Sequence, residues 1–181
     1  RLAGDGVAVE HGASLHARDA DSRLVLWLLG REGGKSFVAA GGAPLTGTAT
    51  APNRAAIFAA LSSGHGTTVV RAGPGTAKSL VTIDEPAIDA RALLERLAKA
   101  ACAKGIAIAP DAQRGETSVS LREVPVDAAL AAFAAATGTR VVMGRDLLFM
   151  VPKDLALADL PAKTPDGAFM LRVAACAVRT L

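Results

Sequence analysis

Aromatic side chains are scarce in this chain: five Phe, one Trp and no Tyr make up 3% of its 181 residues. Proteins that bind single-stranded nucleic acid stack successive bases on aromatic rings, and these few scattered rings cannot form such a platform. The formal net charge is only +3, and Lys and Arg are dispersed instead of forming a basic stripe. We therefore expect no nucleic-acid partner.

Long apolar runs and clusters of metal ligands are also missing. No run of 18 apolar residues occurs, so we expect no membrane span in this chain. The three His and two Cys form no pair with zinc-ligand spacing, so we expect no metal and no cofactor. A Ser-His-Asp set would need Ser63, His65 and Asp84, but no nucleophile elbow or oxyanion loop accompanies them. The prediction is a protein that is not an enzyme.

The two cysteines, Cys102 and Cys176, lie far apart and are flanked by small apolar residues. One interpretation is a pair of buried thiols that behave as small hydrophobic side chains. The other is a disulfide that ties the C-terminal segment to the body of an exported protein. Spacing alone does not decide between them.

The stretch AGPGTAKS, residues 72–79, is similar to a phosphate-binding loop. Such a loop has glycines at fixed positions and leads into a helix. Here Ala72 and Ala77 occupy the glycine positions, and the β-branched run LVTIDE follows at once, ending at Pro86. The pattern indicates a linker that precedes a strand and not a nucleotide site.

The chain contains the same order of predicted elements twice. In each unit a strand leads into a helix capped by Asp, at Asp21 and at Asp89, and these two positions lie 68 residues apart. A strand, a second strand, a second helix and a closing strand follow in both units. The second unit closes with a hairpin in which Val141–Met143 pairs with Leu147–Val151.

This order predicts an α+β protein made of two tandem small β-α-β-β-α-β(-β) domains. We expect the two helices of each unit to pack on one face of a small mixed sheet. The predicted boundaries are a first domain at 7–73, a linker at 74–79, a second domain at 80–152, and a connector with a C-terminal apolar segment at 153–181.

The second unit carries a V-x-L-x-x-V-P-x-x-x-A-L run, at Val119, Leu121, Val124, Pro125, Ala129 and Leu130. With its strand, its helix of paired leucines and its apolar strand, it resembles the short domain at the N-termini of secretins and TonB-dependent receptors (the STN domain). The first unit, through RDADSRLVLWLLGREGGKSFVAA, is similar to the periplasmic N-terminal domains of type IV pilus or type II secretion secretins. It departs where Gly47 to Pro52 spans five positions and Gly115 to Pro125 spans ten, so we expect a shortened strand there.

The resemblance implies a non-enzymatic, periplasmic protein–protein interaction module of a secretin-type secretion or type IV pilus machine. Such a module, associated with the outer membrane, would act in ring assembly or in docking to inner-membrane components. Its partners would be machinery subunits or further copies of itself. The alternative is a signalling domain of a TonB-dependent transducer, which relays to an inner-membrane regulator. A tandem pair argues against that alternative, because the transducer version normally resembles a single copy.

Small α+β domains interact with partners through exposed sheet edges. The candidate interaction edges are Val81, Thr82, Ile83, Asp84, Val141, Val142, Met143, Leu147, Leu148, Phe149 and Met150. The competing interpretation is that these are ordinary sheet residues whose edges are covered, as proteins commonly arrange.

Overall fold

The computed structural model describes most of the chain from Ser14 to Asp154, and short strands near both ends. The described residues are 2–4, 7–10, 14–64, 66–109, 112, 115–144, 146–154 and 179–180. The strands are β1 (Leu2–Gly4), β2 (Val7–Glu10), β3 (Ser14–Asp21), β4 (Phe37–Gly41), β5 (Pro44–Thr50), β6 (Thr67–Arg71), β7 (Leu80–Asp89), β8 (Gly105–Ile108), β9 (Glu116–Pro125), β10 (Thr139–Met143), β11 (Leu147–Pro152) and β12 (Arg179–Thr180). The helices are α1 (Ser22–Glu32), α2 (Arg54–Ser62), α3 (Ala90–Ala100) and α4 (Val126–Ala136). From β3 to β11 the elements follow the predicted order.

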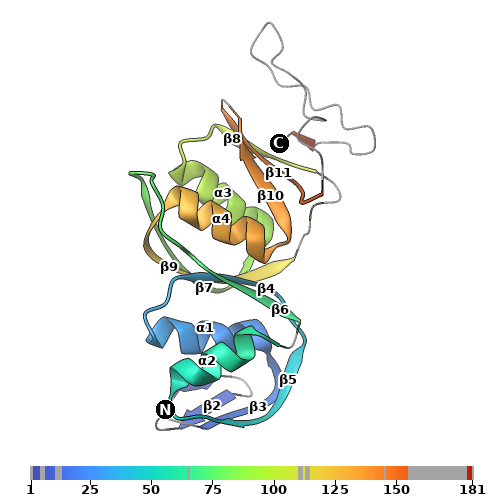
Figure 1. The fold of residues 1–181 in the computed structure, drawn as a ribbon. Helices are drawn as coiled ribbons and strands as arrows, with labels where there is room; N and C mark the ends of the chain where they lie inside the picture. Colours follow the sequence, from blue (N-terminus) through green and yellow to red (C-terminus); the bar gives the residue numbers. More distant parts are fainter. Residues whose placement is uncertain are drawn as a thin grey trace, which may run out of the picture.

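Sheets and helix pairs alternate in the described part of the chain (Figure 1). The strand order is β1-β2-β3-β5 in the first sheet, β6-β4-β9-β7 in the central sheet and β10-β11-β8-β12 in the third. Helices α1 and α2 lie between the first and central sheets, and α3 and α4 lie between the central and third sheets. The α+β class is thus confirmed. The layering differs from the expected one, because each helix pair packs between two sheets instead of on one face of a single sheet.

The central sheet is shared by the two repeats. Strands β4 and β6 come from the first unit, and β7 and β9 come from the second. β4 and β9 run antiparallel, with Phe37 opposite Ser120 and Ala40 opposite Thr117. The two units are therefore joined edge to edge by backbone hydrogen bonds.

Strand β4 is buried on both faces. Phe37 and Ala39 belong to the core around α1 and α2, whereas Val38 and Ala40 belong to the core around α3 and α4. None of the four is more than 3% exposed. A strand covered on both sides by helices carries a continuous apolar run, which explains the sequence FVAA.

Both Asp caps occur as predicted. The Asp21 carboxylate accepts a hydrogen bond from the backbone N–H of Arg23 at 2.8 Å, and Asp89 accepts one from Arg91 at 2.9 Å. These bonds satisfy donors that the first turn of a helix leaves free. The paired leucines of the second unit's first helix, Leu93 and Leu94, are fully buried in α3, and so is Leu97.

The repeat extends to irregular points of the backbone. β3 loses its regular register with β5 within Ala17–Ala20, and β7 loses its register with β9 within Glu85–Ile88. Just after the first helix of each unit, Gly34 has a φ of 63° and Cys102 a φ of 58°. Each pair of features is separated by 68 positions, the same spacing as the two caps. The units therefore share their turns and bulges as well as their element order.

The first unit was expected to have a shorter strand before its second helix than the second unit has, and this is confirmed. β5 has seven residues and β9 has ten. β9 continues to Pro125, directly before α4, whereas β5 ends at Thr50 and Asn53 then caps α2. The missing residues are at the C-terminal end of β5.

The segment 72–79 lies against α4. The carboxylate of Asp127 accepts hydrogen bonds from the backbone N–H of Thr76 at 2.7 Å and from its hydroxyl at 2.9 Å. Ala72 and Ala77 pack against the core around α3 and α4. Because β7 begins at Leu80 with no helix before it, the segment does not have the phosphate-loop arrangement.

Asp127→Asn should lower stability at neutral pH, and this loss should disappear in acid. Hydrogen bonds, first of all from the backbone N–H of Thr76, lower the pKa of Asp127 to about 2 from an ordinary value of 3.8. The stability linked to this carboxylate is present above pH 4 and is lost as the pH falls from about 4 to about 2. Urea unfolding midpoints of both proteins at several pH values measure this. Asp154→Asn, at an exposed position, is the control; a constant Asp127→Asn difference down to pH 2 would contradict the prediction.

Candidate interaction surface

Two of the three predicted edge segments are outer strands. β7, which contains Val81–Asp84, is the outer strand of the central sheet, and β10, which contains Val141–Met143, is the outer strand of the third. The third segment, Leu147–Met150 in β11, is an inner strand between β10 and β8, so its prediction as an edge is wrong. Its backbone groups bond to neighbours on both sides, although the predicted hairpin with β10 is confirmed.

The β7 edge is irregular, and most side chains of its predicted interaction segment are buried or hydrogen-bonded within the chain. It carries Pro86 and loses register with β9 twice, and both features are known to protect sheet edges. Val81 and Ile83 are buried, and the hydroxyl of Thr82 accepts a hydrogen bond from the N–H of Glu123 at 3.1 Å. This edge is therefore a poor acceptor for a partner strand.

Asp84 holds the two units together. Its carboxylate accepts a hydrogen bond from the indole N–H of Trp27 at 2.9 Å and pairs with the guanidinium of Arg31 at 3.2 Å. The Arg31 guanidinium also lies 4.9 Å from the centre of the Trp27 ring. Asp84 thus fastens α1 to the central sheet, so it is not a free group for an outside partner.

We call Arg23, Trp27, Arg31 and Ser36 the α1 docking surface, because each contacts β7 or β9. Arg23 forms an ion pair with Glu116 at 3.1 Å, and the Arg31 carbonyl accepts a hydrogen bond from the Arg122 guanidinium at 3.4 Å. The Ser36 hydroxyl accepts one from the Arg122 backbone N–H at 3.2 Å. The hydroxyl of Ser120, on β9, is buried and has no hydrogen-bond partner in the structure.

Arg23 also couples this surface to the cap of α1. Its guanidinium lies 2.6 Å from the Asp21 carboxylate, and its hydrogen bond to that side chain holds the pKa of Asp21 below its ordinary value. In turn, the same bond raises the pKa of Arg23. The Arg23 guanidinium therefore contacts both the capping residue of α1 and the second unit.

Beside the β10 edge lies a groove of about 350 Å³ between β10 and α4. Its lining consists of Ala131, Ala134, Ala135, Gly138, Thr139, Arg140, Val141 and Lys153. Small side chains of α4 leave the edge accessible, and Met143 at the end of β10 is 49% exposed. Of the predicted edges, β10 is the one that has an outer side with no strand neighbour and an adjoining groove, among the residues that the structure describes.

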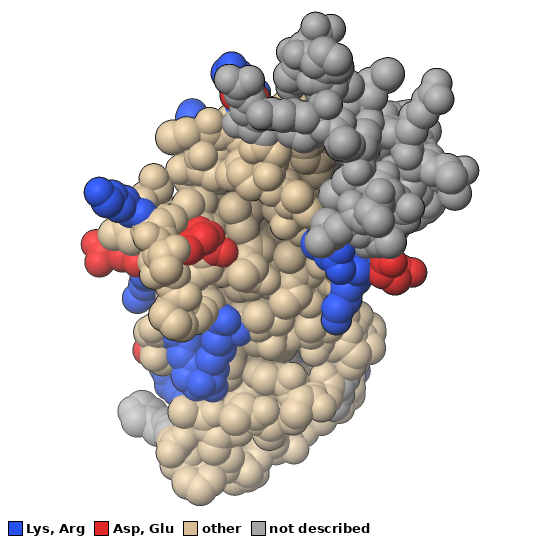
Figure 2. All heavy atoms as spheres, turned by 45° about the horizontal axis from the view of Figure 1, so that its top comes forward, with Lys and Arg blue, Asp and Glu red and all other residues tan. Residues whose placement is uncertain are grey.

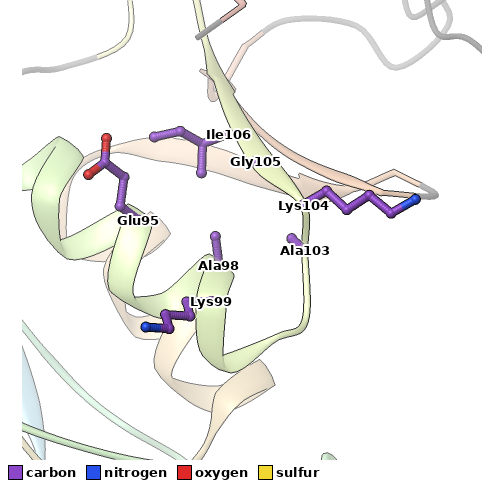
Figure 3. Close-up of a pocket in the computed structure, with 7 residues that line it drawn as sticks. All are labelled: Glu95, Ala98, Lys99, Ala103, Lys104, Gly105 and Ile106. Atoms are coloured by element: carbon purple, nitrogen blue, oxygen red, sulfur yellow. The ribbon is translucent and has the colours of Figure 1, made fainter.

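A second groove, of about 340 Å³, lies between α3 and the start of β8 (Figure 3). It is lined by Glu95, Ala98, Lys99, Ala103, Lys104, Gly105 and Ile106. Ile106 points toward α3, whereas the Lys104 side chain points away from the groove. None of these residues was predicted as part of a site, although the spacing of 68 relates all seven of them to residues 27–38, in α1 and the segment that follows it.

The disulfide prediction stays untested, because Cys176 lies outside the described residues. Cys102 is exposed and forms no disulfide with a residue that the structure describes, so the interpretation of two buried thiols is wrong for Cys102. His11 and His65 also lie outside them, and His16 hydrogen-bonds to the hydroxyl of Thr48 at 3.1 Å.

Charged side chains of both signs are spread over the face that Figure 2 shows. Lys and Arg form several separate groups there, with a broad area that has neither sign. Among the residues that the structure describes, no group of His, Cys, Asp or Glu is arranged to hold a metal ion. No helix in this part of the chain is both long and apolar enough to cross a membrane. Comparison of the chain with protein-family models, curated proteins and solved structures gave no match.

Proposed function

We propose that this chain is a non-enzymatic protein–protein interaction module of a secretin-type secretion or type IV pilus machine. It would work in the periplasm, in ring assembly or in docking to inner-membrane components. The proposal rests on the STN-like pattern of the sequence and on the way the chain joins its own units. Its protein partners bind through sheet edges.

The observation that supports this most is the antiparallel pairing of β4 with β9. Through it, the two predicted units associate by strand pairing, which proteins also use between separate chains. The open β10 edge and its neighbouring groove give a partner the same type of contact.

Native mass spectrometry of the full chain, with light scattering as a check, tests the ring-assembly part. We expect a ring-sized oligomer, and Met143→Glu should reduce it, because the charge lies at the end of the open β10 edge. Thr68→Glu, at an exposed site on the outer strand β6, is the matched control and should leave the oligomer intact.

A strict monomer at all concentrations would contradict ring assembly. The same spectra, recorded before and after reduction, also test the disulfide between Cys102 and Cys176. A mass gain of two hydrogens on reduction would support it, and an unchanged mass would exclude it.

A further inference from the structure

The α3–β8 groove is the counterpart, in the second unit, of the α1 docking surface. At the spacing of 68, Trp27, Arg31 and Ser36 correspond to Glu95, Lys99 and Lys104, which all line the groove. In the first unit, the equivalent surface is covered by β7 and β9. In the second unit, the residues that the structure describes leave this surface as a groove (Figure 3).

The edge of β8 beside the groove pairs with an antiparallel strand, as the corresponding edge of β4 does. β4 pairs with β6 on one side and with the antiparallel β9 on the other. β8 pairs with β11 on one side, and on its other side β12 runs antiparallel, with Arg179 opposite Ile108 and Thr180 opposite Ala107. β12 covers only these two residues of β8, so Gly105 and Ile106 have no strand neighbour on that side in the described part of the chain.

The chemistry of the groove differs from that of the α1 docking surface. Glu95 stands where the first unit has Trp27, and it already pairs with Arg91 at 3.1 Å. Lys99 makes no ion pair with any residue that the structure describes, and Lys104, 77% exposed, pairs only at the surface with Asp146. The groove therefore has an unpaired cation at the position from which Arg31 binds Asp84.

We propose that the α3–β8 groove binds an extended acidic segment of a partner protein, antiparallel to β8 at Gly105 and Ile106, beside the two residues that β12 already covers, with a carboxylate on Lys99. This inference rests on the proposed role as an interaction module and specifies one of its surfaces and the chemistry of its partner. Backbone hydrogen bonds to β8 supply affinity, and the Lys99 ammonium selects acidic sequences. Ala98, Ala103 and Ile106 form the apolar floor over which the segment lies.

A second copy of the chain fits this groove less well. The strands equivalent to β7 and β9 in the first unit are β3 and β5, and the outer side of β5 has no strand neighbour in the described part of the chain. At the spacing of 68, however, the residue equivalent to Asp84 is His16, which offers no carboxylate to Lys99. Charge complementarity thus favours an acidic partner over self-association at this site.

The test uses the full chain and a fluorescein-labelled peptide with the sequence Glu116–Pro125 in which Arg122 is replaced by Glu. A matched peptide carries Lys at each acidic position. We expect saturable binding of the acidic peptide by fluorescence anisotropy, weakening as salt increases, and at least tenfold weaker binding of the basic peptide. Amide chemical shifts in ¹⁵N-labelled protein should change at residues 104–106 and in α3.

Lys99→Glu should weaken the acidic peptide roughly three- to tenfold, and Lys104→Glu should weaken it in the same direction. Lys153→Glu, an equal charge reversal beside the other groove, should change the affinity less than about twofold. All three sites are exposed, so circular dichroism should show unchanged folding.

Equal effects of Lys99→Glu and Lys153→Glu would overturn the proposal in favour of non-specific attraction. Unchanged shifts at 104–106 would overturn it by showing that this part of the edge admits no further strand. Self-association that Lys99→Glu abolishes would assign the groove to a second copy. Peptide binding by a chain that forms no ring would refute ring assembly and leave this groove in place, so the two failures are distinguishable.

Discussion

Val38→Asp should unfold both repeats at once, although the substitution lies in the first. Val38 is a β4 residue with no exposed surface, and it packs in the core around α3 and α4. A carboxylate there would lie between helices of the second unit without a partner, at an expected cost above about 4 kcal/mol. Such a loss is a large fraction of the stability of a protein this size.

Two probes follow the two units separately. Fluorescence of Trp27, the chain's one Trp, reports on the first unit and its junction. Hydrogen exchange of the α3 amides reports on the second. We expect both signals to be lost together in the variant, whereas Thr68→Asp, at an exposed position in the same sheet, should change stability by no more than about 0.5 kcal/mol. Protected α3 amides in Val38→Asp would show that the second unit folds independently of β4.

Gly30→Ala should destabilise the first unit by about 2 kcal/mol, although Ala favours helices. A Cβ on Gly30 would lie 2.8 Å from Cζ of Phe37 and 2.9 Å from Cε2 of Phe58, far inside normal contact. The two rings are fixed edge to face, with centroids 5.3 Å apart, and Phe37 is fully buried. Overpacking costs up to about 3 kcal/mol, and the gain in helix propensity returns about 1 kcal/mol.

Phe37→Leu supplies the rescue. It removes ring atoms next to Gly30, so the double variant should be more stable than the sum of the single effects predicts, by at least about 1 kcal/mol. Gly33→Ala, at the end of the same helix, is the control, because its nearest neighbouring atom would be 3.4 Å away. Urea denaturation of the wild-type protein, the two single variants and the double variant measures their free energies of unfolding, and the same measurement is made on the Gly33→Ala control. Additive effects would show that the Phe37 ring is not what excludes a side chain at Gly30.

Caps, stripes and turns were predictable because each depends on nearby residues. The sharing of the central sheet was not predicted, and β9 shows why. Val119 and Leu121 face one core, but the alternating residues Ser118 and Ser120 are also buried, in a strand that contacts α1. Short polar side chains at buried positions produce the same apolar–polar alternation as a strand with one exposed face. The sequence of β9 therefore indicated a strand that is covered on one face only.

The sequence does indicate the inner position of β11. Leu148, Phe149, Met150 and Val151 are all buried and show no alternation. An unbroken apolar run is typical of a strand covered on both faces and seldom of an edge. By contrast, the α3–β8 groove is recognisable only after α1 is seen in contact with the central sheet, because nothing local to Lys99 or Lys104 indicates a binding site.

The pairing of β4 with β9 has a consequence for synthesis on the ribosome. Phe37 emerges long before its strand neighbour Ser120, which lies 83 positions later in the chain. Until then, the nascent first unit exposes an apolar strand whose hydrogen-bonding groups have no partner on one side. Pairing over such a separation forms slowly, and the unpaired strand is prone to aggregation until its partner strand has been synthesised. The first unit should therefore fold fully only after the second has been synthesised. A fragment that contains the first unit alone would lack β9, the strand that pairs with β4.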